Sequence, residues 1–173
     1  MMKKMAMSGL ILSMLFSIVL QGGCRQQAGT PEGELTGQSE CKVFLAGIVP
    51  QDEPECMHYR YADNTLHLSQ RNGAFNCCPG KISAAIAVND HTITIKETEQ
   101  EAGCHCLCLY DLELEIHNLP PGAYRIIVDE PYLNNEPALD FVCDLEQQSE
   151  GDFCLNRDSY PWAIAGHGQP KMR

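Results

Sequence analysis

Short runs in which apolar and polar residues alternate fill the middle of the chain. Residues 57–61 and 65–69 flank the turn residues 62–64, and residues 82–88 are joined through Asn89 and Asp90 to residues 92–97. Because successive side chains of a strand point to opposite faces, these runs predict half-buried strands joined by hairpin turns. The chain shows no amphipathic helical pattern and no internal repeat. The pattern therefore predicts an antiparallel sheet.

The longest alternating run covers residues 104–116. One face of this run carries three cysteines followed by apolar residues: Cys104, Cys106, Cys108, Tyr110, Leu112, Leu114 and Ile116. In a strand, residues i, i+2 and i+4 share a face, so the three thiols are predicted to continue the apolar face of a single strand. Further strands are expected over residues 124–128, 139–145 and 153–155.

The segment Leu119-Pro-Pro-Gly-Ala-Tyr124 resembles the corner motif of transthyretin-like and other immunoglobulin-like sandwiches. This resemblance implies architecture only, because such folds host many unrelated functions. A single sheet would leave its apolar face in water, so we expect two sheets. The predicted fold is an all-β, disulfide-rich, antiparallel two-sheet sandwich of seven or eight strands, immunoglobulin-like or transthyretin-like.

The first 23 residues have the features of an export signal. Lys3 and Lys4 precede an apolar stretch over residues 5–20, which is too short for a spanning helix. Gly22-Gly23-Cys24 resembles the lipobox of bacterial lipoproteins, although Gln21 stands where that family usually has Leu. The resemblance implies that Cys24 receives a diacylglyceryl group and becomes the mature N-terminus, held in a membrane by its acyl chains at ~0.8 kcal/mol per buried methylene.

The polar composition after Cys24 sets the predicted domain limits. Residues 25–40 contain Leu35 as their one large apolar residue and cannot repay the entropy of folding. We therefore predict a lipoprotein signal peptide over 1–23, a flexible tether over 24–40, one sandwich domain over 41–165 and a loose tail over 166–173.

Acidic residues dominate the charge of the chain. Loss of residues 1–23, which contain two lysines and no acid, changes the formal net charge from −11 to −13. Such a charge argues against nucleic acid as a partner and is typical of a solvated acidic surface. An alternative is that some of the acidic residues bind calcium, although no loop has the spacing of a calcium motif. The oxygen ligands would then come from Asp129, Glu130, Asn134, Glu136 and Asp140.

Ten cysteines in an exported chain indicate a disulfide framework. Because nine cysteines remain apart from Cys24, at least one has no partner within the chain. The nine are Cys41, Cys56, Cys77, Cys78, Cys104, Cys106, Cys108, Cys143 and Cys154. Adjacent cysteines and cysteines two apart in a strand are poorly placed to join each other. The Cys77-Cys78 pair is therefore expected to bond to the cluster at Cys104, Cys106 and Cys108.

Two further disulfides are suggested by proximity in sequence. Cys143 with Cys154 would close a loop of about 12 residues, worth ~3 kcal/mol. Cys41 with Cys56 is the other suggestion. The alternatives for the thiol cluster are a thiol-rich metal site and a redox site. Both are disfavoured, because a straight strand does not bring its sulfurs together around zinc, and no C-x-x-C motif is present.

Catalytic signatures are absent from the sequence. The six histidines occupy scattered strand and turn positions, and no nucleophile elbow, HExxH motif or phosphate loop occurs. We therefore predict a protein that is not an enzyme and that has no cofactor.

Four further motifs together resemble a group of uncharacterised bacterial envelope lipoproteins. They are NCCP at 76–79, CxCLCLYDL at 104–112, LPPGxY at 119–124, and Cys-x-x-Arg with Tyr-Pro-Trp at 154–162. The resemblance implies a cellular location and an architecture, but no enzymatic reaction. We expect an exported protein anchored to a membrane of the cell envelope, on the periplasmic face or the cell surface. It would serve as a binding or structural module for an unknown envelope or extracellular ligand; the alternative is a thiol-based metal-binding or redox protein.

Overall fold

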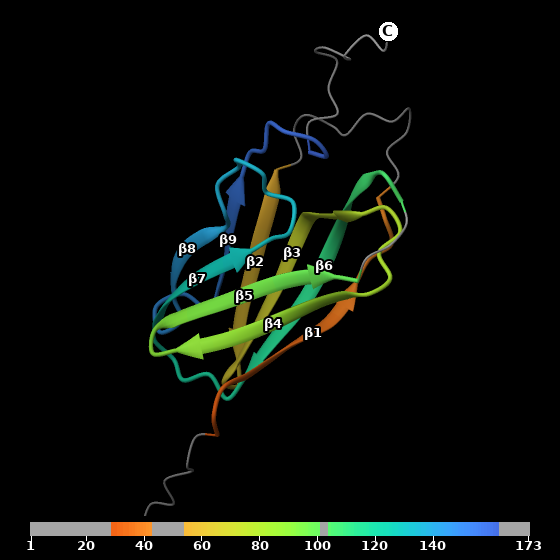
Figure 1. Cartoon of the computed structure of the whole chain (residues 1–173). Coiled ribbons are helices and arrows are strands. Elements are labelled where there is room, and N and C mark those ends of the chain that lie inside the picture. The colour runs from red at the N-terminus through yellow and green to blue at the C-terminus, as the bar shows by residue number, and fades with distance from the viewer. Residues whose placement is uncertain (1–28, 43–53, 101–103, 163–173) are drawn as a thin grey trace, which may run out of the picture.

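A computed structural model describes residues 29–42, 54–100 and 104–162 of the chain (Figure 1). These residues form nine strands: β1 (Glu32–Gln38), β2 (Glu55–Ala62), β3 (Thr65–Asn76), β4 (Ile82–Asn89), β5 (Thr92–Glu99), β6 (Leu107–His117), β7 (Ala123–Asp129), β8 (Asp140–Asp144) and β9 (Glu150–Leu155). No helix among the described residues is long and apolar enough to cross a membrane.

The strands form two sheets that face each other across one core. The five-stranded sheet, here sheet A, has the order β1-β6-β3-β2-β9, and the four-stranded sheet, here sheet B, has the order β4-β5-β7-β8. Within the sheets every pairing is antiparallel except that of β5 with β7, which is parallel. The core contains fully buried residues from both sheets, such as Leu66 and Leu114 from A and Ile95 and Ile126 from B. The predicted all-β, two-sheet, disulfide-rich sandwich is confirmed, but it has nine strands instead of the expected seven or eight, and one of its pairings is parallel.

Both predicted hairpin turns are present. Asp63 and Asn64 connect β2 to β3 with φ angles of 51° and 58°, and Asp90 connects β4 to β5 with a φ of 52°. Asn and Asp tolerate this left-handed region better than other residues with a Cβ. A turn with two positive φ angles also matches the twist of the strands it joins. The turn residues therefore fix the register of these hairpins.

The corner at Leu119-Pro-Pro-Gly-Ala-Tyr124 closes on itself through a hydrogen bond. The buried Tyr124 ring lies at the start of β7, and its hydroxyl donates to the carbonyl oxygen of Pro120 at 2.9 Å. This pattern matches the tyrosine corner of immunoglobulin-like sandwiches. The bond ties the loop after β6 to the first inward position of β7.

The predicted tether is wrong for the segment that forms β1. Glu32–Gln38 pairs along β6 as an edge strand, so the folded domain begins before residue 41. The strand has one large apolar side chain, Leu35, which packs on the core. Gly33 lets β1 approach β4, since a Cβ there would lie 2.6 Å from the side chain of Ile86. Pairing with β6, rather than apolar content, holds this strand, and the composition therefore missed it.

The predicted single strand over residues 104–116 is also wrong at its beginning. β6 starts at Leu107, and of the three cysteines only Cys108 continues its buried face. Cys104 and Cys106 lie in irregular chain before the strand, and the Cys106 side chain is exposed. Disulfides draw both residues to the segment that follows β3, which prevents a straight continuation of β6.

Candidate functional site

Four disulfides account for eight of the nine cysteines among the described residues. They are Cys41–Cys108, Cys56–Cys154, Cys77–Cys106 and Cys78–Cys104. The expected bonding of Cys77 and Cys78 to the Cys104 cluster is confirmed, with one bond from each neighbour. One backbone hydrogen bond also joins this pair just beyond the β3–β6 ladder, since the Cys77 N–H donates to the Cys106 carbonyl oxygen at 3.0 Å.

The two disulfides suggested by sequence proximity are both wrong. Cys41 bonds to Cys108 on the neighbouring strand, with the Cα atoms 5.7 Å apart, and Cys56 bonds to Cys154, which lies opposite it in the β2–β9 ladder. Strand neighbours in space, rather than neighbours in sequence, therefore decide the pairing. Cys143 on β8 is buried and unpaired among the described cysteines.

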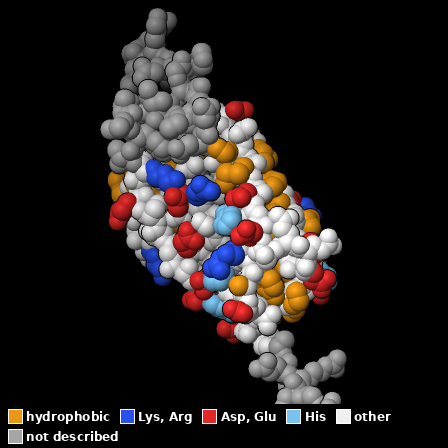
Figure 2. Space-filling view, turned by 180° about the vertical axis from the view of Figure 1, so that it is seen from behind, with side chains coloured by type: hydrophobic (Ala, Val, Ile, Leu, Met, Phe, Trp, Pro, Cys, Tyr) orange, Lys and Arg blue, Asp and Glu red, His pale blue; other side chains and the backbone are white. Residues whose placement is uncertain are grey.

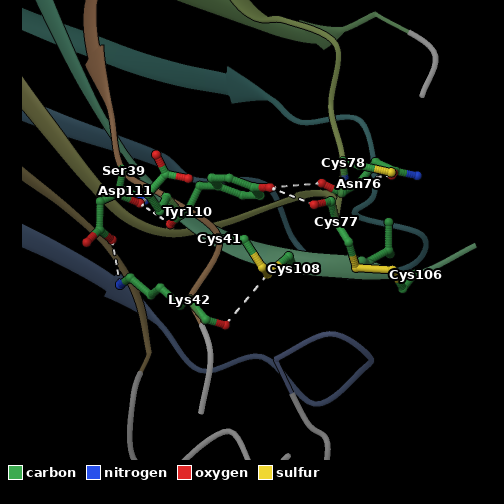
Figure 3. Close-up of a disulfide and its surroundings, with 12 residues drawn as sticks. Ser39, Cys41, Lys42, Asn76, Cys77, Cys78, Cys106, Cys108, Tyr110 and Asp111 are labelled. Atoms are coloured by element: carbon green, nitrogen blue, oxygen red, sulfur yellow. Dashed lines mark hydrogen bonds and ion pairs between the residues drawn. A yellow bond between two sulfur atoms is a disulfide. The ribbon is translucent and has the colours of Figure 1, made fainter. Parts of the chain in front are cut away.

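Figure 3 shows how the Cys41–Cys108 bond is embedded between the strands. Next to it, the Lys42 ammonium lies 2.6 Å from the Asp111 carboxylate, while the Asp111 N–H donates to the Ser39 hydroxyl at 2.9 Å. The Tyr110 hydroxyl donates to the carbonyl oxygen of Asn76 at 3.1 Å. The chain after β1 is thus fixed to β6 by a covalent bond and by polar contacts. No thiolate is free in this cluster.

The outer face of sheet A carries mixed charges rather than one sign (Figure 2). Three histidines on this face lie beside carboxylates, with His58 3.1 Å from Asp152 and His67 3.1 Å from Glu115. His117 lies 3.6 Å from both Glu34 and Glu115. These exposed or half-exposed pairs fit the expected surface role of the histidines.

The strongest candidate site lies inside the sandwich, at the end that holds the Cys77 and Cys78 disulfides. There the inward positions of five strands or their extensions change from apolar to polar. Each of these side chains is at least nine-tenths buried: Glu55 at the start of β2, Gln70 on β3, Glu97 on β5, Glu130 after β7 and Arg157 after β9. We call these five residues the polar end.

Arg157 is the cation at the centre of the polar end. Its Nε donates to Glu55 Oε2 at 2.6 Å and its Nη2 donates to Glu130 Oε2 at 3.0 Å; Nη2 also contacts Glu55, and Nη1 donates to the Pro137 carbonyl oxygen. The guanidinium lies over the Trp162 ring, 5.1 Å from the ring centroid. Gln70 Nε2 donates to Glu55 Oε1 at 2.8 Å. Arg157 therefore binds two of the three buried carboxylates.

Glu97 is the carboxylate that Arg157 does not bind. Its side chain is 3% exposed, and neither of its oxygens has a hydrogen-bond partner; the buried Gln70 Oε1 also lacks one. Burial raises the pKa of Glu97 well above its ordinary value, and the charges of Glu55 and Asp129 raise it further. A contact with the Gln70 amide, longer than a normal hydrogen bond, lowers the pKa by less than burial and the charge of Glu55 raise it. Burial and Glu55 also raise the pKa of Glu130, against the opposing charge of Arg157.

A pocket of about 620 Å³ opens beside Glu97 and Glu130. Sheet B and the loop after β7 supply nearly all of its lining, and Asn76 comes from sheet A. Glu99 forms one wall of this pocket together with Asn76 and Tyr132. It accepts a hydrogen bond from the Asn76 N–H at 2.8 Å and another from the Tyr132 hydroxyl. Asp129 adds a fourth carboxylate to the lining. The pocket is therefore rich in acidic groups.

The described residues contain no group of three or more His, Cys, Asp or Glu side chains arranged to hold a metal ion. Of the oxygen ligands considered for calcium, Asp129 and Glu130 line the pocket. Asp140 instead binds Arg125 on the neighbouring strand, and Glu136 accepts backbone N–H bonds from Asp158 and Ser159. The five residues therefore do not converge on one calcium ion.

Sequence reasoning missed the polar end, although two signals pointed to it. Continuing the alternation of Ile93 and Ile95 by one step places Glu97 on the inward face. The Cys-x-x-Arg and Tyr-Pro-Trp motifs contain Arg157 and Trp162, whose stacking defines the centre of the polar end. Both signals were present in the chain, but the pairing of the sheets was needed to bring these residues together.

Some predictions fall on residues that the structure does not describe. These are the signal peptide over 1–23, the lipid site Cys24 and the loose tail over 166–173. No family model matches this chain, and no curated protein or solved structure gives a match either.

Proposed function

We propose that this protein is an exported, lipid-anchored binding module of the bacterial cell envelope, and that the pocket beside the polar end receives its ligand. The observation that carries the binding role is the acidic pocket of about 620 Å³ beside the polar end, behind which the buried Glu97 carboxyl group has no hydrogen-bond partner. An unsatisfied buried polar group costs about 1–3 kcal/mol, more when it is charged. Such a group is expected where function, rather than stability, requires it.

The compartment is supported by the disulfides. Four disulfides in one domain fit an oxidising environment outside the cytoplasm, which is where the export signal at residues 1–23 would direct the chain. Residues 22–24 resemble a lipobox, which adds the membrane anchor at Cys24.

The competing function is a thiol-based metal or redox protein. Metal binding needs free thiolates, whereas Cys77, Cys78, Cys104, Cys106 and Cys108 are all in disulfides. Burial raises the pKa of the remaining Cys143 thiol to about 11, so this group stays protonated and unreactive at neutral pH. The binding module is therefore the better supported proposal.

Fractionation of expressing cells tests the anchor. Wild-type protein should label with radioactive palmitate and sediment with membranes, whereas Cys24→Ser should do neither. Cys143→Ser is the matched control, since it removes another cysteine and should behave as wild type. Equal labelling and sedimentation of the wild type and Cys24→Ser would refute the anchor.

Two measurements on the purified full-length protein test the binding role. A thermal-shift screen with cationic, anionic and neutral small molecules should find at least one class that raises Tm, and Glu97→Gln should change that response. A count of free thiols, with metal analysis of the same sample, should find no reactive thiol in the folded domain and no metal. Several reactive thiols with bound metal would favour the thiol-based function instead.

A further inference from the structure

Two of the four disulfides join the same two segments of the chain. Cys77–Cys106 and Cys78–Cys104 both link the residues after β3 to the residues before β6, with Cα separations of 5.5 Å and 5.9 Å. The entropic contribution of a disulfide grows with the length of the loop that it closes. Once one bond of this pair is formed, the other closes only a small ring. The second bond therefore adds little to the stability that the first provides.

Cys78–Cys104 is the bond of the pair that the fold needs less. Cys77–Cys106 lies directly beyond the last residue pair of the β3–β6 ladder, next to the backbone hydrogen bond from Cys77 to Cys106 (Figure 3). Opening Cys78–Cys104 leaves that end of the ladder covalently closed. Alone, Cys78–Cys104 would span a sequence separation of 26, but beside Cys77–Cys106 it closes a ring of about five residues, which reduces its effect on the unfolding equilibrium constant roughly tenfold.

Cys78 and Cys104 are also more accessible than the cysteines of the other bonds that fix the fold. Both residues are partly exposed. The two disulfides at the edges of sheet A each include a cysteine that is only 8% exposed, Cys56 in one and Cys108 in the other. Thiol–disulfide exchange requires a thiolate to approach a disulfide sulfur, so exposed disulfides are the labile ones. A thiol reagent should therefore open Cys78–Cys104 before the edge disulfides.

Asn76 holds the two cysteines of this bond together independently of their sulfur atoms. The Cys78 N–H donates to Asn76 Oδ1 at 3.0 Å, and Asn76 Nδ2 donates to the Cys104 carbonyl oxygen at 2.8 Å. Asn76 is itself buried, and its backbone N–H donates to Glu99 at 2.8 Å. When the disulfide opens, these hydrogen bonds keep the two thiols close to each other. The bond can then close again without a search by the chain.

We propose that Cys78–Cys104 is an exchangeable disulfide that takes up two electrons from a protein dithiol, with Asn76 as its positioning residue. A thiolate of the dithiol attacks one sulfur of the bond, forms a mixed disulfide and releases the other cysteine as a thiolate. The second thiol of the reductant then attacks the mixed disulfide. The products are the Cys78 and Cys104 thiols and the disulfide of the reductant, so two electrons and two protons are transferred. This inference goes beyond the proposed binding function and does not rest on it.

Limited reduction of the purified full-length protein with dithiothreitol tests the assignment. Thiols are trapped at intervals with N-ethylmaleimide and located by tandem mass spectrometry, while circular dichroism follows the fold. We expect the Cys78 and Cys104 thiols to appear first, at least about tenfold faster than those of the edge disulfides, with the folded spectrum unchanged. Oxidised glutathione should then restore the bond. Earlier opening of any other disulfide, or loss of the folded spectrum with the first two thiols, would overturn the proposal.

Paired serine variants test whether the fold needs this bond. Replacing Cys78 and Cys104 together should raise the unfolding equilibrium constant by roughly tenfold less than replacing Cys56 and Cys154 together, because the second pair closes a much longer loop. Urea unfolding of the oxidised proteins measures both changes. Equal changes in the two variants would make Cys78–Cys104 a structural bond, which contradicts the proposal.

The role of Asn76 is measured by the equilibrium of the bond with glutathione. Asn76→Ala removes both hydrogen bonds and should make Cys78–Cys104 roughly tenfold easier to reduce. Tyr110→Phe is the matched control, because the Tyr110 hydroxyl donates to the carbonyl oxygens of Asn76 and Cys77 and to neither cysteine of this bond. It should leave the equilibrium unchanged. The same shift in both variants would show that Asn76 is not the positioning residue.

Discussion

The two sheets of this protein are held together in different ways. All four disulfides join strands of sheet A or the segments next to them, whereas among the described residues sheet B contains no disulfide and holds the unpaired Cys143. Two of these disulfides fix the edges of sheet A: Cys41–Cys108 holds the chain after β1 to β6, and Cys56–Cys154 holds β9 to β2. Both sheets contribute fully buried aliphatic residues to the core, such as Leu66 and Leu114 in sheet A and Ile93 and Ile95 in sheet B. The sheets therefore differ in their covalent bonds and not in their apolar burial.

The polar end joins these two differently built sheets. Glu55, Gln70 and Arg157 come from sheet A and its extension, whereas Glu97 and Glu130 come from sheet B and its extension. The hydrogen bond from Arg157 to Glu130 therefore links the two sheets. Disulfides fix one half of the site, and the half that lines the pocket is free of them.

The largest expected effect comes from reducing the disulfides. One native disulfide of a small exported domain contributes about 2–5 kcal/mol, and a domain has only about 5–15 kcal/mol in total. Reduction of all four should therefore unfold the protein or leave it with little stability. Hydrogen exchange during mild reduction should show β1 and β9 losing protection before β5 and β7. Simultaneous loss in both sheets would contradict the contrast drawn between them.

The next effect concerns Arg157, which links the two sheets. Arg157→Met removes the cation and leaves Glu55 and Glu130 buried without it, which should cost about 3–5 kcal/mol. Urea unfolding at pH 7 measures the loss. Arg125→Met is the matched control, since the side chains of Arg125 and its partner Asp140 are 55% and 37% exposed and the pair should contribute about 0–1 kcal/mol. Similar losses in the two variants would show that burial does not matter at Arg157.

The smallest effect is the dependence of stability on pH in sheet B. Because the folded state raises the pKa of Glu97, it keeps a proton that the unfolded chain loses, so stability falls as pH rises above the ordinary value for glutamic acid. The slope is at most about 1.4 kcal/mol per pH unit for one proton. Glu97→Gln should be more stable than wild type at pH 7 and should show a flatter curve, as urea unfolding between pH 4 and 8 would reveal. If the stability of the wild type and of Glu97→Gln changed with pH in the same way, the raised pKa would not belong to Glu97.

The sequence predicted the parts of the fold that depend on local pattern. The alternation around Ile93 and Ile95 predicted β5, and Asp63 with Asn64 predicted the β2–β3 turn, because side-chain period and turn chemistry are local properties. The bonding of Cys77 and Cys78 to the Cys104 cluster followed from the covalent geometry of neighbouring cysteines.

The rest depended on contacts between distant segments. β1 is stabilised by β6, which lies about 80 residues further along the chain, so composition alone favoured a tether. The partners of Cys41 and Cys56 are likewise set by which strands are neighbours. Glu97 belongs to the candidate site because inward positions of both sheets meet at one end, and a single strand's pattern does not contain that information.

The position of β1 also determines how the domain would stand on a membrane. Glu32, the first residue of β1, pairs with His117 at the last position of β6, whereas Leu107 at the other end of β6 pairs with Asn76 of the pocket lining. The 11 residues of β6 rise about 3.3 Å each, so roughly 35 Å separates these ends. The eight residue steps from Cys24 to Glu32 span at most about 29 Å. A chain lipidated at Cys24 would keep the Glu32 end near the bilayer and turn the pocket toward the aqueous phase, so its ligand would arrive from solution and not from the lipid.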